Sequence, residues 1–391
     1  MLCPNYTEEL LGLKDIFLKH VERRDNKLCI HVEMHKRLHK CPRCGEWTSK
    51  VHDYRKQTIK DISAFGETTV IHLCKRRHVC PMCGKRFYET VPFLPRYHRI
   101  TSRLAAYVIK SLKEVGSMKS VATMVNLSQP TIARIFDQVG YTAKTLPRVL
   151  SLDEFRGNAG GEKFQCIVTD PENKRVIDIL PNRKTEDMAG YFLGYKDRKA
   201  VQYVVIDMSG PYRSLAKSLF PHAKIIADRY HVVRQVMWAF ENVRKAEQAK
   251  FYESRRKYFK RSRRVLLKKP DRLTEEEADQ VESMLKISER LRQAYFLKNE
   301  FHKLMGCKSK EEARKQLGIW NMMATGYNLP EFQACTKTFI NWSEEILNSF
   351  EYPFSNGYTE GVNNKIKVIK RNAFGVRNFK RFRNRILHVM S

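Results

Sequence analysis

Apolar and polar positions follow the periods of strands and helices in turn from about residue 147 onward. Short apolar runs bounded by turn residues predict five strands, at residues 149–155, 164–169, 175–180, 201–206 and 224–227. Helical spacing predicts helices at residues 185–195, 211–220 and 230 to about 246. A meander of three strands, followed by strands that alternate with helices, predicts a mixed α/β sheet. Right-handed crossovers would give its strands the spatial order 3-2-1-4-5.

The other parts of the chain differ in character from this α/β segment. Residues 247–350 have a helical and highly charged pattern, with one long helix expected at 274–297 behind Thr274 as its N-cap. Because a further helix begins near Tyr358, this region is interpreted as an insertion within the α/β domain. Most cysteines precede residue 94, and short helical patterns follow them. The predicted domain boundaries are 1–93, 94–146, 147–246, 247–350 and 351–391, the last completing the α/β domain.

Carboxylates follow apolar runs at the ends of strands that are predicted to be neighbours. Asp153 lies in the first strand and Asp207 directly follows the fourth, and adjacent strands are about 4.8 Å apart. Carboxylates that converge at this edge of a sheet can hold the hard Mg²⁺ ions that assist phosphodiester chemistry. Asp228 ends the fifth strand, one step further from the first, so Asp207 is preferred as a ligand. Asp228 and His231 are spaced to cap the next helix or to support the wall of the site.

The third carboxylate is expected on a helix after the sheet. Glu360 is the last acidic residue of the chain, and many basic residues follow it. Glu360, Asn363, Asn364 and Lys367 recur at helical spacing, so they share a predicted face suited to a metal ion and a phosphate backbone. An Asp at a strand end or a Glu at a helix start is often only structural, so the prediction depends on all three carboxylates together. The residues expected to contact DNA from this segment are Asn364, Lys365, Lys367, Lys370 and Arg371.

Two Cys-Pro-x-Cys-Gly motifs begin at Cys41 and Cys80. Together they supply four thiols that predict one structural Zn²⁺ ion, at Cys41, Cys44, Cys80 and Cys83. The 35 residues between the motifs exceed the usual ribbon spacing, and strand-like patterns fill them, which fits a zinc ribbon with a longer hairpin. Cys74 and His78 are alternative ligands. Reduced core cysteines or a redox pair would be the other interpretations, and the duplicated motif disfavours both.

Residues 119–125 and 129–139 have the pattern of two short helices joined by a turn, with Ser128 expected to cap the second. Apolar positions would face inward, which leaves the other face for the major groove of DNA, as in a helix-turn-helix. The outward residues would be Gln129, Thr131 and Arg134. An ordinary helical hairpin is the alternative, and the basic flanks favour DNA binding.

The charge balance indicates a polyanionic partner. Lys and Arg number 73 against 42 Asp and Glu, a formal net charge of +31. A charge of this size self-repels unless a polyanion neutralises it, so nucleic acid is the first candidate and an acidic membrane surface the second. The basic residues gather at 254–269 and after Glu360. No apolar stretch approaches the ~18–20 residues of a membrane span, and the N-terminus does not have the pattern of a secretory signal.

These motifs resemble those of DDE transposases of bacterial insertion sequences, and in particular the ISL-three family. The resemblance extends over nearly the whole chain and is carried by Leu152-Asp153-Glu154-Phe155, Ile206-Asp207-Met208-Ser209, Asp228-Arg229-Tyr230-His231 and Thr359-Glu360-Gly361-Val362-Asn363-Asn364. It implies a zinc-binding segment, a helix-turn-helix and a helical insertion before the last Glu. It also implies Asp153, Asp207 and Glu360 as the catalytic triad. The predicted order of strands and helices is that of the RNase H-like fold, which agrees.

The resulting hypothesis is a cytoplasmic enzyme associated with the bacterial nucleoid, with no membrane partner. It would bind double-stranded DNA, namely the terminal inverted repeats of its own element and a target. Two Mg²⁺ (or Mn²⁺) ions at the triad would serve hydrolysis of a phosphodiester and transfer of the freed strand. Because two DNA ends must meet, at least a homodimer is expected. The alternatives are a DNA-binding regulator without catalysis and a metal-dependent nuclease without strand transfer.

Overall fold

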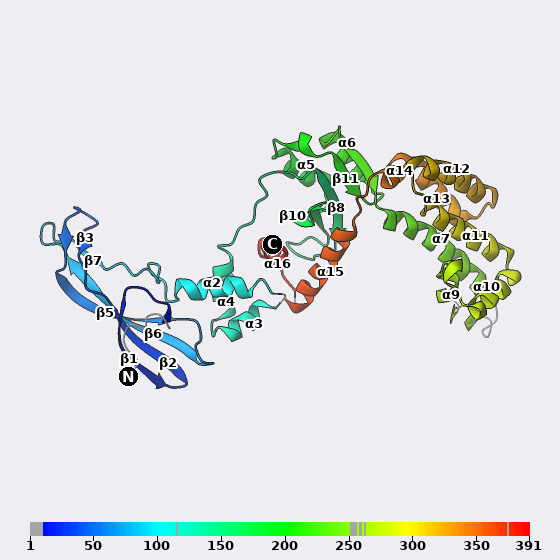
Figure 1. Cartoon of the computed structure of the whole chain (residues 1–391). Helices are drawn as coiled ribbons and strands as arrows, with labels where there is room; N and C mark the ends of the chain where they lie inside the picture. Colours follow the sequence, from blue (N-terminus) through cyan, green and yellow to red (C-terminus); the bar gives the residue numbers. More distant parts are fainter. Residues whose placement is uncertain (1–10, 115, 251–255, 258–259, 262, 374) are drawn as a thin grey trace. The chain divides into compact units, whose positions relative to one another are not determined.

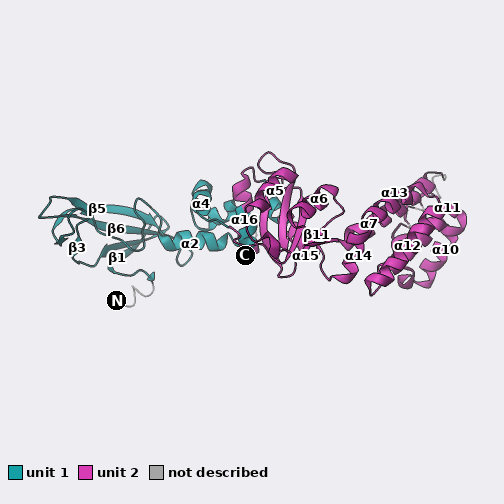
Figure 2. Cartoon of the chain, turned by 90° about the horizontal axis from the view of Figure 1, so that it is seen from above, with its two compact units in different colours: residues 1–141, 368–375, 384–389 teal, residues 142–367, 376–383, 390–391 magenta. Residues whose placement is uncertain are grey.

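The computed structural model describes the chain except for residues 1–10, 115, 251–255, 258–259, 262 and 374 (Figure 1). It divides into two compact units. The first comprises residues 1–141, 368–375 and 384–389, and the second comprises residues 142–367, 376–383 and 390–391 (Figure 2). The last two helices of the chain, α15 (Gly357–Asn372) and α16 (Phe379–Met390), are divided between the units.

A five-stranded sheet forms the beginning of the first unit. Its strands pair in the order β1-β2-β6-β5, with β7 also on β6, and β2 and β6 are parallel while the other pairs are antiparallel. β5 and β6 form the hairpin expected between the cysteine motifs, and β1 and β2 widen it to a sheet that the sequence pattern does not predict. One face buries Ile30, Ile59 and Ile71. The strands are β1 (Ile16–Arg24), β2 (Lys27–Met34), β5 (Val51–Lys60), β6 (Thr68–Val79) and β7 (Arg86–Tyr88), and a separate pair is β3 (His39–Lys40) and β4 (Trp47–Thr48).

Three helices follow this sheet in the first unit: α2 (Ser102–Ser111), α3 (Met118–Met124) and α4 (Gln129–Phe136). Their apolar faces meet in one core that includes Leu104, Val121 and Phe136. The turn between α3 and α4 contains Asn126 at φ +51°, a left-handed conformation that Asn tolerates. Helix α4 ends at Phe136, three residues before the end that the sequence predicts for it. Ser128 stands at its N-cap, but its hydroxyl lies 2.8 Å from that of Thr131 and does not accept from a backbone N–H.

The second unit is built on a five-stranded mixed sheet. Its strands are β8 (Val149–Phe155), β9 (Gln165–Asp170), β10 (Arg175–Leu180), β11 (Tyr203–Ile206) and β12 (Lys224–Ala227). They pair in the order β10-β9-β8-β11-β12, so β8 is central and β8, β11 and β12 are parallel. Side chains alternate between the two faces. Leu150 and Leu152 of β8 join the core that contains α5 (Thr185–Leu193) and α6 (Gly210–Leu219), whereas Val149 packs with Val205 on the other face.

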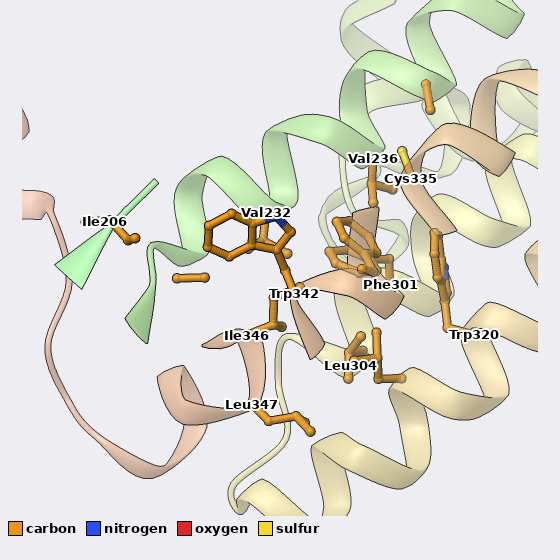
Figure 3. Close-up of a cluster of buried hydrophobic side chains, with 14 of the residues drawn as sticks. Ile206, Val232, Val236, Phe301, Leu304, Trp320, Cys335, Trp342, Ile346 and Leu347 are labelled. Atoms are coloured by element: carbon orange, nitrogen blue, oxygen red, sulfur yellow. The ribbon is translucent and has the colours of Figure 1, made fainter. Parts of the chain in front are cut away.

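A group of helices separates β12 from α15. It contains α7 (Arg229–Ala249), α9 (Arg263–Leu267), α10 (Glu275–Ile287), α11 (Glu289–Leu304), α12 (Lys310–Gly326), α13 (Pro330–Asn341) and α14 (Ser343–Glu351). Val232 and Val236 of α7 lie in the core of this group, beside Phe301 and Trp342 (Figure 3). Part of the predicted basic run, including Arg255, lies outside the described residues. In the described part of the chain, no helix has the length and apolar content that crossing a membrane requires.

The prediction of a single helix at 274–297 is wrong in one respect, because the chain forms two helices, α10 and α11, with a break at Ser288. Thr274 caps α10 through a reciprocal capping box with Glu277, as expected at its start. Ser288 has an extended backbone, its hydroxyl accepts from the N–H of Leu291, and it donates to Glu247 Oε2 at 3.0 Å. Ser competes with helical hydrogen bonding in this way, so a periodic apolar pattern continues across the break without a continuous helix.

After α14 the chain returns to the sheet through hydrogen bonds that hold its backbone in place. The side-chain amide of Asn348 donates to the carbonyl of Ile225 in β12 at 2.8 Å. At the start of α15, the Thr359 hydroxyl is fully buried, 2.9 Å from Ser151 Oγ of β8 and 2.7 Å from Thr169 Oγ1 of β9. These contacts fix the first turn of α15 against the central strands, although about 130 residues separate it from β12.

Replacing the buried hydroxyl tests this anchor. Thr359→Val keeps the shape of the side chain but removes its hydrogen bonds to Ser151 and Thr169. Leaving buried hydroxyls without a partner costs about 1–3 kcal/mol, and we expect the free energy of unfolding to fall by that amount in urea denaturation.

Thr325→Val is the matched control, because Thr325 is an exposed helical threonine on α12. It should change stability by less than about 0.5 kcal/mol. Equal effects of the two substitutions would contradict the anchoring role of Thr359.

Candidate functional site

Three aspartates lie in or directly after three neighbouring strands: Asp153 in β8, Asp207 after β11 and Asp228 after β12. In the parallel pairs, Val205 stands opposite Ser151, and Ile206 stands opposite Ala227. If the β8–β11 register is extended by two residues, Asp207 stands opposite Asp153. If the β11–β12 register is extended by one residue, Asp207 also stands opposite Asp228. Since adjacent strands are about 4.8 Å apart, Asp207 is the central one of the three. All three stand at the carboxyl ends of parallel strands, where open α/β sheets carry their sites.

Asp153 is held in place on both carboxylate oxygens. Its Oδ2 accepts from the side-chain amide of Asn363 in α15 at 2.9 Å, and its Oδ1 accepts from the Glu154 N–H at 2.7 Å. Burial raises the pKa of Asp153 to about 7; the Glu154 N–H opposes this rise, and the negative charges of Asp207, Glu154 and Asp228 add to it. The carboxylate therefore carries its charge at a cost, which a bound cation would offset.

Asp207 has an oxygen that the protein does not satisfy. Its Oδ1 is buried and accepts no hydrogen bond from the described residues. Burial raises its pKa, and the positive charges of His231 and Arg234 oppose the rise. A buried carboxylate oxygen without a donor costs free energy unless a cation is near. Together with Asp153, this donor set of hard oxygens fits Mg²⁺ or Mn²⁺.

Asp228 makes a different set of contacts. It is 4% exposed, its Oδ1 accepts the N–H of Asn356 at 3.1 Å, and its Oδ2 lies 4.0 Å from His231 Nε2. Although Asp228 occupies the N-cap position of α7, its side chain makes no capping hydrogen bond. One carboxylate oxygen is thus bound to the backbone just before α15. Asp228 is placed to position the helix that carries Glu360.

Glu360 lies in the first turn of α15, directly after the buried Thr359, and its side chain is exposed. Among the described residues, Asp153, Asp207 and Glu360 do not form a group whose ligand atoms all lie within 4.8 Å of one another. The helix face predicted around Glu360 is divided. Asn363 is buried against Asp153, whereas Asn364 and Lys367 are exposed and Lys367 donates to Asn364 Oδ1 at 3.0 Å.

Several residues that support this site are not identified by the sequence pattern. Asn356, Thr359 and Ser151 form the buried contacts that hold α15, and Ser151 donates to Asn356 Oδ1 at 2.6 Å. The sequence does not indicate these contacts, because a buried Ser or Thr has the same letters as an exposed one, even where Thr359 stands in a motif. For Asn363, the sequence predicts a position on the face of Glu360 but not its hydrogen bond to Asp153.

The four motif cysteines come together in the first unit. Cys41 Sγ is 3.6 Å from Cys83 Sγ, and Cys44 Sγ is 3.5 Å from Cys80 Sγ. Tetrahedral Zn²⁺ with Zn–S bonds of about 2.3 Å needs sulfurs roughly 3.8 Å apart, so the cluster fits structural zinc. The alternative ligands Cys74 and His78 are not members of this group, and His78 instead groups with His39 and Glu89.

The helix-turn-helix presents the outer face of α4. Gln129 and Arg134 are exposed and Thr131 is half-buried, while Ile132 and Ile135 are buried in the core of the three helices. The exposed face of α4 is therefore available for the edges of bases in a major groove. In the same unit, the Asn384 amide donates to the Val139 carbonyl at 2.7 Å.

A buried carboxylate pair, a four-thiol cluster and a helix-turn-helix are together typical of enzymes that act on DNA. Comparison with known families agrees. Residues 150–386 match a DDE family described as transposase of the ISL3 group, residues 89–140 match the helix-turn-helix domain of transposase family ISL3, and residues 37–83 match the zinc finger of the IS204/IS1001/IS1096/IS1165 transposases. The chain belongs to the ISL3 family of transposases and is a DNA transposase of an insertion sequence.

Individual relatives support the same assignment. The chain is 27% identical over 393 residues to the transposase for insertion sequence element IS1001 of Bordetella parapertussis, with 96% of each chain covered. It is 23% identical to the transposase for IS1557 of Mycobacterium tuberculosis (strain ATCC 25618 / H37Rv), with 55% of this chain and 54% of the relative covered. A Lactococcus lactis protein named an ATP-dependent protease is 36% identical, over only 28% of this chain and 34% of its own length.

The raised pKa of Asp153 has a consequence for stability that can be measured. Because the folded protein holds this pKa near 7, above the unfolded value of ~3.9, ionisation of Asp153 opposes folding increasingly as pH rises from about 4 to about 7. Without added divalent ions, Asp153→Asn should raise the free energy of unfolding at pH 8 by about 1–3 kcal/mol, and by less at pH 5. Urea denaturation at the two pH values measures both differences.

Asp279→Asn, at an exposed position of α10, is the control and should leave stability unchanged at both pH values. A loss of stability in Asp153→Asn at pH 8, or an equal gain at pH 5, would contradict a carboxylate that is strained by burial and like charge.

Proposed function

We propose that the transposase cleaves and joins DNA at a two-metal site formed by Asp153, Asp207 and Glu360, on an RNase H-like core. The observation that carries this proposal is that Asp153 lies on β8 and Asp207 directly follows β11, its parallel neighbour, with Asp207 Oδ1 buried and unsatisfied by the described residues. Glu360 completes the set from α15, whose first turn is fixed by Thr359. Asp228 and His231 act as positioning residues.

Two bound Mg²⁺ (or Mn²⁺) ions would activate the attacking oxygen and stabilise the leaving one. In cleavage, a water oxygen forms a bond to phosphorus, the bond from phosphorus to the 3′ oxygen breaks, and the 3′ oxygen takes up a proton. In strand transfer, the freed 3′-hydroxyl attacks a phosphodiester of target DNA in the same way. Asp153 and Asp207 would hold the metal ions that serve both steps, and Asn363 keeps the Asp153 carboxylate oriented.

DNA recognition is assigned to the parts of the chain outside the carboxylate site. Cys41, Cys44, Cys80 and Cys83 hold one zinc ion that orders the end of the first sheet, and Gln129, Thr131 and Arg134 of α4 contact bases in the terminal inverted repeats. The backbone of the terminal or target DNA is contacted by Asn364 and by the basic residues Lys365, Lys367, Lys370 and Arg371. Because two ends are joined, we propose a homodimer as the active form.

We further propose that the five segments 1–93, 94–146, 147–246, 247–350 and 351–391 have the roles of zinc ribbon, helix-turn-helix, first catalytic part, helical insertion and last catalytic part. The hydrogen bond from Asn348 to Ile225 and the burial of Thr359 support this division. Both contacts lie where the chain returns to the sheet after the helical group.

Cleavage of duplex DNA that carries the ends of the element, with Mg²⁺, tests the assignment of the aspartates. Asp207→Asn should lower the cleavage rate by at least about a thousandfold, because it removes charge at the metal pair. Asp228→Asn should retain activity within about tenfold, because the new amide oxygen can still accept the Asn356 N–H.

Activity that survives Asp207→Asn and vanishes in Asp228→Asn would reverse the roles of the two residues. Hydrolysis without any joined product would indicate a nuclease without strand transfer. Tight binding of the ends without cleavage by the wild type would indicate a regulator.

A further inference from the structure

Helix α7 has two faces with different composition. It begins directly after Asp228 and runs for 21 residues into the helical group. Val232, Val236 and Phe240 form its buried stripe, and Figure 3 shows Val232 and Val236 among the packed side chains of that group. Tyr230, Arg234 and Trp238 follow one another at intervals of four, each displaced by two residues from the buried stripe. A displacement of two residues is about 200° around a helix, so these three side chains stand on the opposite face.

The three side chains form a stacked series, here called the α7 ladder (Tyr230, Arg234 and Trp238). The Arg234 guanidinium lies 4.5 Å from the centroid of the Trp238 ring and 5.8 Å from that of Tyr230. Tyr230 is 53% exposed and Trp238 is 57% exposed. Neither ring is needed by the core, which is already filled from the other face of the helix. Two large exposed rings held by one cation form a preformed stacking surface.

The α7 ladder begins at the carboxylate site. The ring of Tyr230 contacts that of His231, with centroids 5.5 Å apart, and His231 Nε2 lies 4.0 Å from Asp228 Oδ2. Trp238 lies one turn beyond Arg234 along α7, roughly 6 Å along the helix axis. A DNA strand whose phosphodiester reached Asp153 and Asp207 would have its adjacent nucleotides within range of these rings.

We propose that the α7 ladder binds an unpaired nucleobase of the DNA strand that is cleaved at Asp153 and Asp207. The proposal rests on the proposed catalytic function. Aromatic rings stack on the face of any base, and a guanidinium adds attraction to both the base and the phosphate backbone. Inside a duplex the faces of a base are covered by its neighbours, so only a base that has left the stack can occupy the ladder. The ladder would thereby hold the strand open at the bond to be broken.

The charge of the α7 ladder favours this occupant over a second protein surface. Arg234 places a cation in the middle of the exposed rings, and the same ladder on another copy would bring a like charge against it. A DNA strand neutralises this cation. Association of two copies through the ladder is therefore a distinct outcome that the experiment has to separate.

A cycle of two changes, one in the protein and one in the DNA, tests the inference. The probes are duplexes that carry the ends of the element, with each nucleotide beside the cleaved bond in turn replaced by an abasic residue. Their single-turnover cleavage is measured with wild type, Trp238→Ala and Trp238→Phe. Ile340→Ala is the control, because Ile340 is 61% exposed on α13 and lies outside the ladder.

On intact DNA, Trp238→Ala should slow cleavage by about 5- to 150-fold, the range expected for loss of one stacked base. Trp238→Phe should stay within about threefold of wild type, and Ile340→Ala should not differ from it. At one position, the abasic residue should slow cleavage by wild type to a similar extent. At that same position, Trp238→Ala should cleave the abasic DNA no more slowly than it cleaves intact DNA. This loss of additivity identifies the base that stacks on Trp238.

Additive losses at every position, or equal rates for Trp238→Ala and Ile340→Ala, would overturn the α7 ladder as a base site while the catalytic function stands. A fall in the molar mass of the active species with Trp238→Ala, measured by light scattering, together with additive losses, would assign the ladder to contact between copies. If wild type does not cleave the intact ends with either Mg²⁺ or Mn²⁺, the proposed function fails, and the ladder proposal fails with it.

Discussion

The carboxylate site depends on a buried polar contact between the sheet and the start of α15. Asp228 accepts the backbone N–H of Asn356, and Ser151 and Thr169 meet the hydroxyl of Thr359, all at buried positions. Buried groups of this kind are costly when unpaired, about 1–3 kcal/mol each, so the contact has one favourable arrangement. It determines where Glu360 and Asn363 lie after a long excursion through the helical group. Apolar packing alone would allow the helix to slide or turn.

The same region stores electrostatic strain. Three aspartates on adjacent strands repel one another, and burial raises the pKa of Asp153 and of Asp207. An apolar residue at either position would stabilise the fold and remove the ligands, which is the usual conflict between stability and activity. The excess of basic residues elsewhere acts in the opposite sense, because it attracts DNA toward the site. Acid groups at the sheet edge and basic groups over the rest of the chain therefore have complementary roles.

The sequence predicts the strands well where apolar runs end at turn residues, and β8, β10 and β12 have the predicted bounds. It also predicts that β11 lies beside β8, since right-handed crossovers leave few possible strand orders. It fails where the deciding interaction is tertiary. Ser288 breaks a periodic helix because Glu247 is near in space, and Asn363 turns inward because Asp153 accepts its amide. The sequence does not predict that β1 and β2 extend the N-terminal sheet, because these two strands carry no motif.

We propose that the catalytic metal ions lie between Asp153, Asp207 and Glu360, with Asp228 outside their ligand set. Replacement of Mg²⁺ by Fe²⁺, followed by peroxide and ascorbate, produces hydroxyl radicals that cut the polypeptide only near the bound metal. Mass spectrometry of the fragments then gives the positions of the cuts. We predict cuts close to residues 153, 207 and 360, all lost in Asp207→Asn and retained in Asp228→Asn. Cuts near residue 228 that persist in Asp207→Asn and disappear in Asp228→Asn would contradict the account.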